Sequence, residues 1–203
     1  MKEIKKLGIM GGTFNPIHIG HLAMAEEIRK RFNLNKVLFV PTGNPPHKKI
    51  DSLASTEDRY MMTILATISN KDFLVSDIEI KRKGTSYTID TIKQLREEYT
   101  ESEIYFITGA DAILEIETWK NTQELLNICN FIATTRPRYD VEELLSRIKK
   151  LEEKYERKIS LLSIVPLDIS STDIRNRLKG GKTIKYMVPD SVIDYINKRN
   201  IYK

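Results

Sequence analysis

The chain has 203 residues, of which 40% are hydrophobic and 30% charged, with a formal net charge of +5. This length predicts one well-cored domain spanning residues 1–203, with the composition of a soluble globular protein. The N-terminal residues lack the apolar stretch of a signal peptide, and no apolar run approaches the ~20 residues that span a bilayer. We therefore expect a cytoplasmic location and no membrane partner. The sequence leaves a homo-oligomer open.

The charge pattern restricts the class of partner, and the position of the single cysteine indicates its role. The sequence pI of about 9.1 fits either an anionic small substrate or a nucleic acid. Basic residues are interspersed with acids, and no aromatic and basic stripe of the single-strand-binding kind is found, so we expect no nucleic-acid partner. Cys129 lies in an apolar segment and is predicted to be a buried small hydrophobe.

Strand and helix patterns alternate along the chain. Strands are predicted over residues 7–10, 36–40, 73–75, 78–80, 103–108, 130–134 and 159–165. Helices are predicted over residues 19–32, 57–69, 87–99, 110–116, 121–126, 141–155, 172–179 and 190–200. Ser55 and Asp58 resemble a capping pair at the start of the second helix. This alternation predicts an α/β fold with a doubly wound, mostly parallel sheet and helices on both faces. In such sheets, ligands bind beyond the carboxyl ends of the strands.

The first strand is followed by the sequence GGTFNPIHIGH, residues 11–21. A strand thus runs into a turn with two glycines, and the turn runs into a helix whose start bears His18 and His21. Such a junction offers backbone N–H groups and the positive end of a helix dipole to an anion. A zinc pair and a purely structural turn are the alternatives. Zinc is disfavoured because the chain has only one other histidine and one cysteine, and no glutamate between the pair.

The loop after the second strand, residues 41–56, is the longest irregular stretch. It contains the sequence PPHKK, in which His47 and Lys48 could contact phosphates at the sheet edge. A solvated basic turn is the alternative.

The segment GTSYTIDT, residues 84–91, precedes an amphipathic helix. Thr85 or Ser86 can serve as the N-cap, which is a sufficient structural reason for the hydroxyls. The same helix start could also receive a carboxylate or a phosphate. From this segment alone we favour the cap.

Two further segments follow later strands. Gly109 and Asp111 come directly after a strand, where glycine permits close backbone approach and the acid could bind ribose hydroxyls or stabilise a helix start. Trp119, the only tryptophan, could belong to the core or stack on a flat ring.

The sequence ISSTDIR, residues 169–175, follows the last strand. Three hydroxyls at a helix start and Arg175 one turn later form a second candidate anion site. The alternative is an N-cap at Ser171 or Thr172 with a surface arginine. Two phosphate sites together indicate a polyphosphate ligand or two phosphorylated substrates.

These motifs cover the whole length of the chain, and with them it resembles the HIGH-type nucleotidyltransferases. Within that superfamily it is similar to the bacterial nicotinate-mononucleotide adenylyltransferases, because GTSYTIDT occurs together with Trp119 and with TTRPRY after the fifth strand. Asn15 stands where the family pattern usually has Asp. Asparagine keeps the side-chain shape and an acceptor oxygen while losing a charge.

The resemblance implies a Rossmann-like nucleotidyltransferase fold and an enzyme of NAD biosynthesis. It implies that the phosphate of nicotinate mononucleotide attacks the α-phosphorus of ATP directly, forming deamido-NAD while pyrophosphate leaves with Mg²⁺. No covalent intermediate is implied. Catalysis would then rest on positioning and on charge stabilisation at the transferring phosphorus.

The resemblance also assigns roles to residues of this chain, none of them as a ligand of a resident metal. The catalytic candidates are His18, His21, Lys48 and Arg175. ATP and its phosphates would be contacted by Gly11, Gly12, Thr13, Phe14, Gly109, Asp111, Ile169, Ser170, Ser171 and Thr172. Nicotinate mononucleotide would be contacted by Thr85, Ser86, Tyr87, Thr88, Trp119 and Arg136.

Three other readings share part of this pattern. Pantetheine-phosphate adenylyltransferases would share both phosphate sites but are not expected to have GTSYTIDT with a tryptophan. Class I aminoacyl-tRNA synthetases also contain HIGH, but this chain is short and has no KMSKS loop. A nucleic-acid-binding module is supported only by the basic pI.

Overall fold

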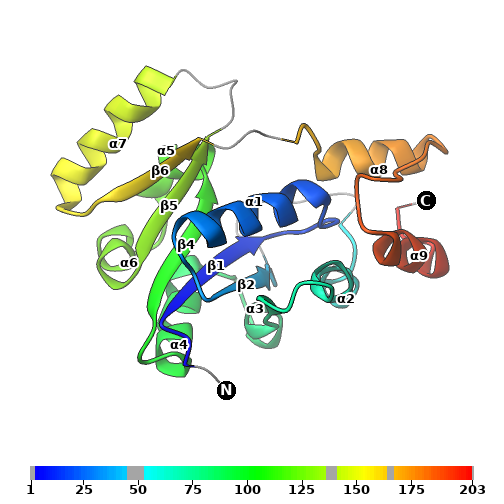
Figure 1. Ribbon diagram of the computed structural model, residues 1–203, viewed down its shortest axis with the longest axis horizontal. Coiled ribbons are helices and arrows are strands. Elements are labelled where there is room, and N and C mark those ends of the chain that lie inside the picture. Colours follow the sequence, from blue (N-terminus) through cyan, green and yellow to red (C-terminus); the bar gives the residue numbers. More distant parts are fainter. Residues whose placement is uncertain (1–2, 45–52, 136–140, 164–166, 203) are drawn as a thin grey trace.

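The computed structural model describes residues 3–44, 53–135, 141–163 and 167–202 (Figure 1). The candidate residues His47, Lys48 and Arg136 lie outside these ranges, as does the side chain of Asp111. None of the helices in the described part of the chain combines the length and apolarity that a membrane span requires.

Six parallel strands form one sheet in the order β3-β2-β1-β4-β5-β6. The strands are β1 (Lys6–Gly12), β2 (Lys36–Pro41), β3 (Phe73–Val75), β4 (Glu103–Gly109), β5 (Asn130–Thr135) and β6 (Ile159–Ser163). The order reverses at β1, from which the chain first winds toward β3 and then toward β6. This arrangement confirms the predicted doubly wound sheet, and its switch point lies between β1 and β4.

Helices cover both faces of the sheet (Figure 1). One face packs against α1 (Ile19–Arg31), α2 (Thr56–Thr67), α8 (Ser171–Lys179) and α9 (Asp190–Arg199). The other packs against α3 (Ile78–Lys81), α4 (Thr88–Glu98), α5 (Ala110–Leu114), η1 (Ile116–Thr118), α6 (Thr122–Ile128) and α7 (Val141–Tyr155). Each central strand therefore buries residues on both faces, as Ile9 and Met10 of β1 do. This double burial explains why the strands read as continuous apolar runs.

Residues 78–80 were predicted to be a strand, and this prediction is wrong. They form α3, in which the N–H groups of Ile80 and Lys81 both donate to the carbonyl of Asp77 at 2.9 Å. Three alternating residues cannot distinguish a strand from one helical turn. The sheet edge ends at β3, so no neighbouring strand remains to pair with this segment.

The two glycines of the first motif belong to β1 and not to the turn that follows. Gly11 pairs with Val40 and Gly12 with Pro41 in the parallel ladder. A Cβ atom at Gly12 would lie 2.8 Å from the ring of Phe14, so the close packing of that ring requires glycine. The turn consists of the residues after Gly12.

Two smaller predictions are confirmed. Ser55 caps α2, with its hydroxyl accepting from the Asp58 N–H at 3.0 Å. Cys129 is buried, and burial raises the pKa of its thiol to about 12. A thiol with this pKa stays protonated near neutral pH and is a poor nucleophile.

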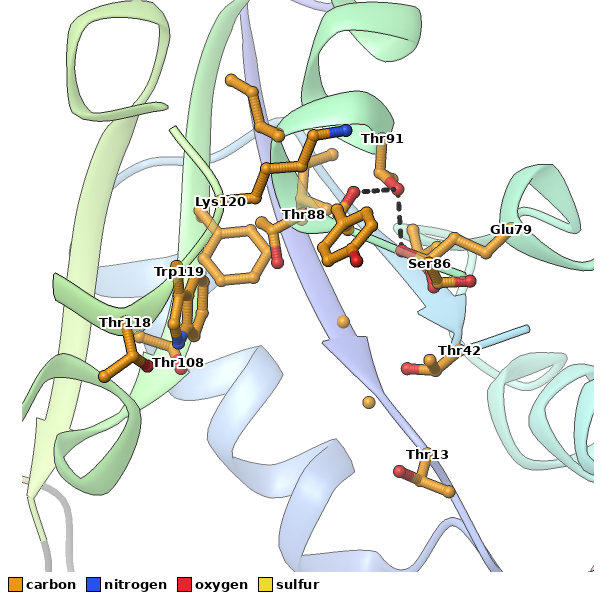
Figure 2. Close-up of a pocket in the computed structure, with 17 residues that line it drawn as sticks. Thr13, Thr42, Glu79, Ser86, Thr88, Thr91, Thr108, Thr118, Trp119 and Lys120 are labelled. Carbon is orange, nitrogen blue, oxygen red and sulfur yellow. Dashed lines mark hydrogen bonds between the residues drawn. The ribbon is translucent and has the colours of Figure 1, made fainter. Parts of the chain in front are cut away.

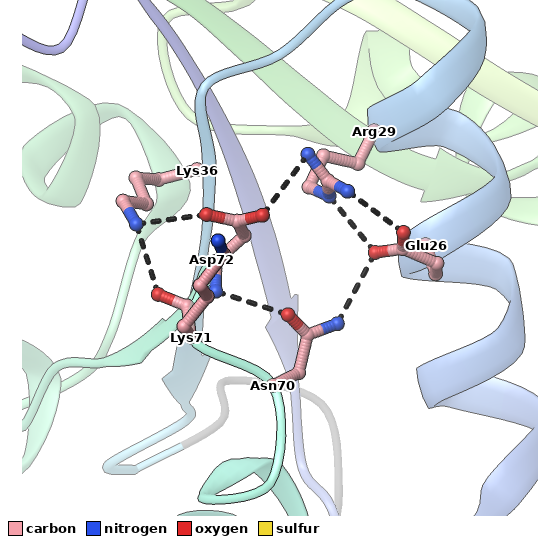
Figure 3. A network of polar contacts seen from close by, with 6 residues as sticks. All are labelled: Glu26, Arg29, Lys36, Asn70, Lys71 and Asp72. Carbon is pink, nitrogen blue, oxygen red and sulfur yellow. Dashed lines mark hydrogen bonds and ion pairs between the residues drawn. The ribbon is translucent and has the colours of Figure 1, made fainter.

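A polar network fastens α1 to the start of β2 and the residue before β3 (Figure 3). Arg29 forms ion pairs with Glu26 at 2.8 Å and with Asp72 at 3.3 Å. Lys36 pairs with Asp72 at 2.9 Å. Because Lys36 begins β2, the network lies at the amino ends of the strands. It is therefore on the opposite edge of the sheet from the carboxyl ends, where a ligand is expected.

Candidate functional site

A cavity of about 910 Å³ opens at the carboxyl ends of β1, β2 and β4 (Figure 2). Its size suits a small-molecule ligand. Its polar lining consists of Thr13, Thr42, Glu79, Ser86, Thr88, Thr91, Thr108, Thr118 and Lys120, and its apolar lining includes Phe106 and Trp119. The predicted residues Gly11, Gly12, Thr13, Ser86, Tyr87, Thr88 and Trp119 all line it, whereas Thr85 does not.

The turn between β1 and α1 is held in a specific conformation. Phe14 adopts a positive φ of 46° and is buried, with its ring edge-on to the His21 ring at a centroid distance of 5.2 Å. A positive φ is uncommon outside glycine and persists only where packing enforces it. Phe14 thus serves the site by shaping the turn.

His18 and His21 are stacked at the start of α1, with ring centroids 3.7 Å apart. His18 is the buried N-cap residue, and its backbone N–H donates to Nδ1 of His21 at 3.2 Å. Because Nδ1 accepts a hydrogen bond, the proton of a neutral His21 ring belongs on Nε2. Both imidazoles lie at the helix start, as the sequence predicts. The structure adds a capping role that the sequence analysis missed.

Asn15 anchors the same turn from inside the protein. Its Oδ1 accepts from the Tyr202 hydroxyl at 2.6 Å and from the Ala54 N–H at 3.0 Å. Both contacts require only an acceptor oxygen, which Asp and Asn supply equally. This explains how asparagine fits a position where the family pattern usually has Asp.

We expect Asn15→Ala to destabilise the protein by about 1–4 kcal/mol, because the buried Tyr202 hydroxyl and the part-buried Ala54 N–H would each lose a partner, at a cost of up to ~1–3 kcal/mol for a buried donor. Urea unfolding measures the loss. Asn35→Ala is the matched control, since the Asn35 Oδ1 also accepts two backbone N–H groups, at 3.0 and 2.8 Å, but on the exposed surface. Water can replace those bonds, so a control that loses as much stability as Asn15→Ala would contradict the argument. Asn15→Asp should retain the acceptor and the activity.

The start of α8 meets the turn after β1. The Ser171 hydroxyl donates to the Pro16 carbonyl at 2.8 Å, and Nη1 of Arg175 donates to the Asn15 carbonyl at 2.8 Å. Nη2 of Arg175 donates to the Thr172 hydroxyl at 3.2 Å. The N-cap is Ser170, which accepts from the Asp173 N–H, and not Ser171 or Thr172 as predicted. The helix therefore begins one residue earlier than predicted, at Ser171, and the Ser171 hydroxyl is used in tertiary contact.

We expect Arg175→Lys to lower kcat/KM by about tenfold, because an ammonium cannot present a planar fork to two acceptors and a phosphate together. Initial rates at varied ATP concentration measure this. Arg177→Lys is the control on the same helix, where Arg177 pairs with Asp173 at 2.9 Å and forms no other side-chain hydrogen bond or ion pair among the described residues. Full activity of the Arg175→Lys variant would show that Arg175 contributes only its positive charge and not the geometry of its guanidinium.

The start of α4 borders the opposite side of the cavity. The N-cap residue is Tyr87, in extended conformation and without a side-chain cap. Thr85 and Ser86 are not the N-cap, contrary to the sequence-based preference. Ser86 instead forms two hydrogen bonds with Asn44, accepting at its hydroxyl and donating from its N–H. Within the described ranges, no acceptor is found for the N–H groups of Thr88 and Ile89, which both line the cavity.

Trp119 and Lys120 also line the cavity, next to this helix start (Figure 2). Trp119 is half-buried and packs edge-on against Phe106 at a centroid distance of 6.0 Å, so it contacts the core and the cavity at once. Lys120 lies 4.7 Å from the centre of the Tyr87 ring and pairs with Asp90 at 3.0 Å. The sequence analysis missed Lys120, which adds a positive charge to this end of the cavity.

Glu79 is a buried acid in the cavity wall that the sequence analysis also missed. Its carboxylate accepts from the Thr91 hydroxyl at 2.8 Å, and burial raises the pKa of the carboxyl. The only sequence signal was an acid between Ile78 and Ile80. The predicted strand concealed it, because a strand residue between two buried isoleucines would face away from them.

The remaining candidates lie around the same edge of the sheet. Gly109 ends β4, and a Cβ atom placed there would meet no atom of the described residues within 4 Å, so its surroundings are open to a ligand. Asp111 follows in α5. Ile169 precedes the N-cap of α8. Among the described residues, no group of three or more His, Cys, Asp or Glu side chains is placed to hold a metal ion.

Comparison with known proteins agrees with this geometry. The model of the cytidylyltransferase-like family matches residues 9–177. A protein of Thermoanaerobacter sp. named probable nicotinate-nucleotide adenylyltransferase is 52% identical, and the match covers 100% of this chain and 97% of that protein. A protein of the same name from Moorella thermoacetica is also 52% identical, over 98% of this chain and 92% of its own length.

Solved structures give the same result. The structure described as Plasmodium falciparum nicotinic acid mononucleotide adenylyltransferase complexed with NaAD has a TM-score of 0.78 at 25% identity, covering 98% of this chain and 97% of that chain. The same protein complexed with APC has a TM-score of 0.76 at 25% identity, over the same shares of the two chains. With the full-length matches, these likenesses show that the chain belongs to the cytidylyltransferase-like family and, within it, to the nicotinate-nucleotide adenylyltransferases.

Proposed function

We propose that this protein transfers the adenylyl group of ATP to nicotinate mononucleotide, forming deamido-NAD and pyrophosphate. In this reaction a phosphate oxygen of the mononucleotide forms a bond to the α-phosphorus of ATP. The bond from that phosphorus to the oxygen bridging to the β-phosphate breaks, and pyrophosphate leaves with the electron pair. Mg²⁺ enters with ATP as part of the substrate. No covalent enzyme intermediate is needed.

One observation supports this proposal above the others. A single cavity at the sheet's switch point is bordered by Thr13 of the turn between β1 and α1 and by the start of α4, and α8 contacts that same turn. Two helix starts near the cavity and a third helix that presents an arginine would suit two phosphorylated substrates that must meet in line. Holding both near the reacting phosphorus supplies the positioning on which phosphoryl-type transfer depends.

The proposed roles combine this geometry with the roles that the family resemblance assigns, including those of Lys48 and Arg136 outside the described residues. Thr13, His18, His21, Lys48 and Arg175 would contact the phosphates, with Gly11, Gly12 and Phe14 shaping the turn that holds them. Gly109, Asp111 and residues 169–172 would bind the adenosine side. Residues 85–88, Trp119 and Arg136 would bind the nicotinate side. The half-buried tryptophan offers a flat surface for the pyridine ring.

The test is an assay of the purified protein with ATP and Mg²⁺ and one acceptor at a time. The acceptors are nicotinate mononucleotide, nicotinamide mononucleotide and phosphopantetheine, and the adenylylated product and pyrophosphate are both measured. We expect deamido-NAD with the first acceptor and little product with the third. Faster reaction with phosphopantetheine would overturn the proposal.

A further inference from the structure

Arg59 is a fully buried arginine in the first turn of α2, behind the wall of the cavity. Only 1% of its surface is exposed. Its guanidinium donates to three backbone carbonyls: from Nη1 to Thr13 at 2.7 Å, from Nη2 to Gly43 at 3.3 Å and from Nε to Ala54 at 3.3 Å. A buried charge is costly unless its hydrogen bonds are satisfied, so this arrangement is maintained against a considerable desolvation penalty.

The three carbonyls belong to three separate segments of the chain. Thr13 follows β1, Gly43 follows β2, and Ala54 precedes the N-cap of α2. The N–H of Thr42 also donates to the Gly12 carbonyl at 2.8 Å, which extends the hydrogen bonding between β1 and β2. The next residue of each segment, Thr13 and Gly43, accepts from the guanidinium. Arg59 thus continues the alignment of the two strands beyond the last strand residues.

The guanidinium also brings a positive charge close to the cavity. No ion pair between Arg59 and a carboxylate is found in the ranges that the structure describes. Burial lowers the pKa of Arg59, but an arginine stays protonated at neutral pH. The guanidinium is hydrogen-bonded directly to the carbonyl of Thr13, and Thr13 lines the cavity. In a buried setting such a charge is weakly screened and favours an anion nearby.

The side of the cavity near α4 is held by other contacts. Ser86 and Asn44 exchange two hydrogen bonds, and the Glu79 carboxylate accepts from Thr91. Gly43 lies between the two systems, where a Cβ atom would clash with the Glu79 carbonyl. Loss of Arg59 should therefore loosen the turn containing Thr13 more than the segment containing Ser86.

We propose that Arg59 is a positioning residue for the polyphosphate of ATP, acting by holding the Thr13 turn against the segment after β2. The proposal rests on the function proposed above for the two substrates. It differs from the family resemblance, which assigns no role to this arginine. The planar fork is the essential property, because one lysine ammonium on a shorter, flexible stem cannot hold three carbonyls from three segments in one plane.

The experiment compares Arg59→Lys and Arg59→Met with Arg29→Met as the matched control. Arg29 is a partly buried arginine, with 12% of its side chain exposed, and it also has several partners, but its network lies at the opposite edge of the sheet (Figure 3). KM for ATP and for nicotinate mononucleotide, kcat and Tm are measured for each variant. We expect KM for ATP to rise about fivefold or more in Arg59→Lys and about tenfold or more in Arg59→Met. KM for the mononucleotide should change by less than about threefold, which is under 1 kcal/mol.

The control should lower Tm without changing KM for ATP, which separates positioning from a general loss of stability. If Arg59→Met does not fold, the KM values of Arg59→Lys alone test the proposal. A folded lysine variant with normal KM for ATP would overturn the proposal, and so would an equal rise in both KM values. Calorimetry, in which ATP and Mg²⁺ are titrated into the protein without any acceptor, measures ATP binding directly. This measurement tests the role of Arg59 even if nicotinate mononucleotide is not the substrate. Weaker binding to Arg59→Lys than to the unaltered protein would then still support the role of Arg59, and equal binding would refute it.

Discussion

Replacing His21 with alanine is expected to lower kcat by about 100-fold or more, comparable to removing one donor from an oxyanion site. The structure supplies the reason through the tautomer of the ring. Because Nδ1 accepts from the His18 N–H, the proton of the neutral ring lies on Nε2, from which we expect it to be donated to a phosphate oxygen of the bound substrate. In-line transfer at phosphorus gains most from donors that meet the charge developing there. Rapid-quench measurement of product formation isolates this step from product release.

The capping role of His21 complicates the interpretation of the rate of His21→Ala, because the substitution also removes a hydrogen-bond acceptor at the start of α1. Loss of such a cap costs ~1 kcal/mol. His21→Asn is the sharper variant, since its Oδ1 can replace Nδ1 as the acceptor while no group replaces Nε2. We expect the asparagine variant to unfold at the normal temperature and to be as slow as the alanine variant. Near-normal turnover of a folded asparagine variant would show that Nε2 does not stabilise the transferring phosphoryl group.

Nicotinate mononucleotide should be preferred over nicotinamide mononucleotide by at least about tenfold in kcat/KM. The N–H groups of Thr88 and Ile89 have no acceptor among the described residues, and both residues line a cavity that is also lined by Lys120, whose ammonium pairs with Asp90 at 3.0 Å. A carboxylate can accept from both groups, and charge-assisted bonds are about twice as strong as neutral ones. A carboxamide would direct its NH₂ at one of these donors, leaving it unpaired at ~1–3 kcal/mol.

Proline at position 88 tests this mechanism directly. Thr88 is the first residue of α4 and Tyr87 before it is extended, with φ of −107° and ψ of 137°. Proline is tolerated at the first helical position, and the residue before a proline prefers an extended conformation. Thr88→Pro should therefore keep the helix while deleting one N–H donor.

We expect Thr88→Pro to narrow the preference for the acid by about fivefold or more, with little change in KM for ATP. Thr88→Ala is the matched control, because it removes the hydroxyl and keeps the N–H. A proline variant with an unchanged acid-to-amide ratio would mean that another group recognises the carboxylate. Equal kcat/KM for the two mononucleotides in the unaltered protein would dismiss the whole recognition scheme.

The outcome at α4 illustrates how far sequence reasoning extends into the site. The sequence analysis favoured an N-cap at Thr85 or Ser86 and left an anion site open, whereas in the structure α4 begins at Thr88, and the N–H groups of Thr88 and Ile89 have no acceptor among the described residues. The shift arises because Ser86 pairs with Asn44, which is 42 residues away. Hydroxyls can satisfy a local cap or a distant backbone group equally well, and nothing in the local sequence distinguishes the two.

The wrongly predicted strand at residues 78–80 concealed the buried acid of the cavity for a related reason. A three-residue pattern of alternating apolar residues does not indicate whether a partner strand exists beside it. Only the end of the sheet at β3 leaves this segment unpaired, so that it turns into α3 and brings Glu79 to Thr91.

The sequence by itself determined the alternating fold, the strand–turn–helix junction with its two histidines, and the membership of a nucleotide-binding family. These features depend on local periodicity, on glycine and on helix starts, which are physical properties of short segments. Only the tertiary structure decided that Arg59 joins the segments after β1 and β2, that Tyr202 reaches Asn15, and that Lys120 contacts Tyr87 and Asp90 at the start of α4. Each of these contacts joins residues distant in sequence, and its energy depends on burial that exists only once the sheet and its helices have packed together.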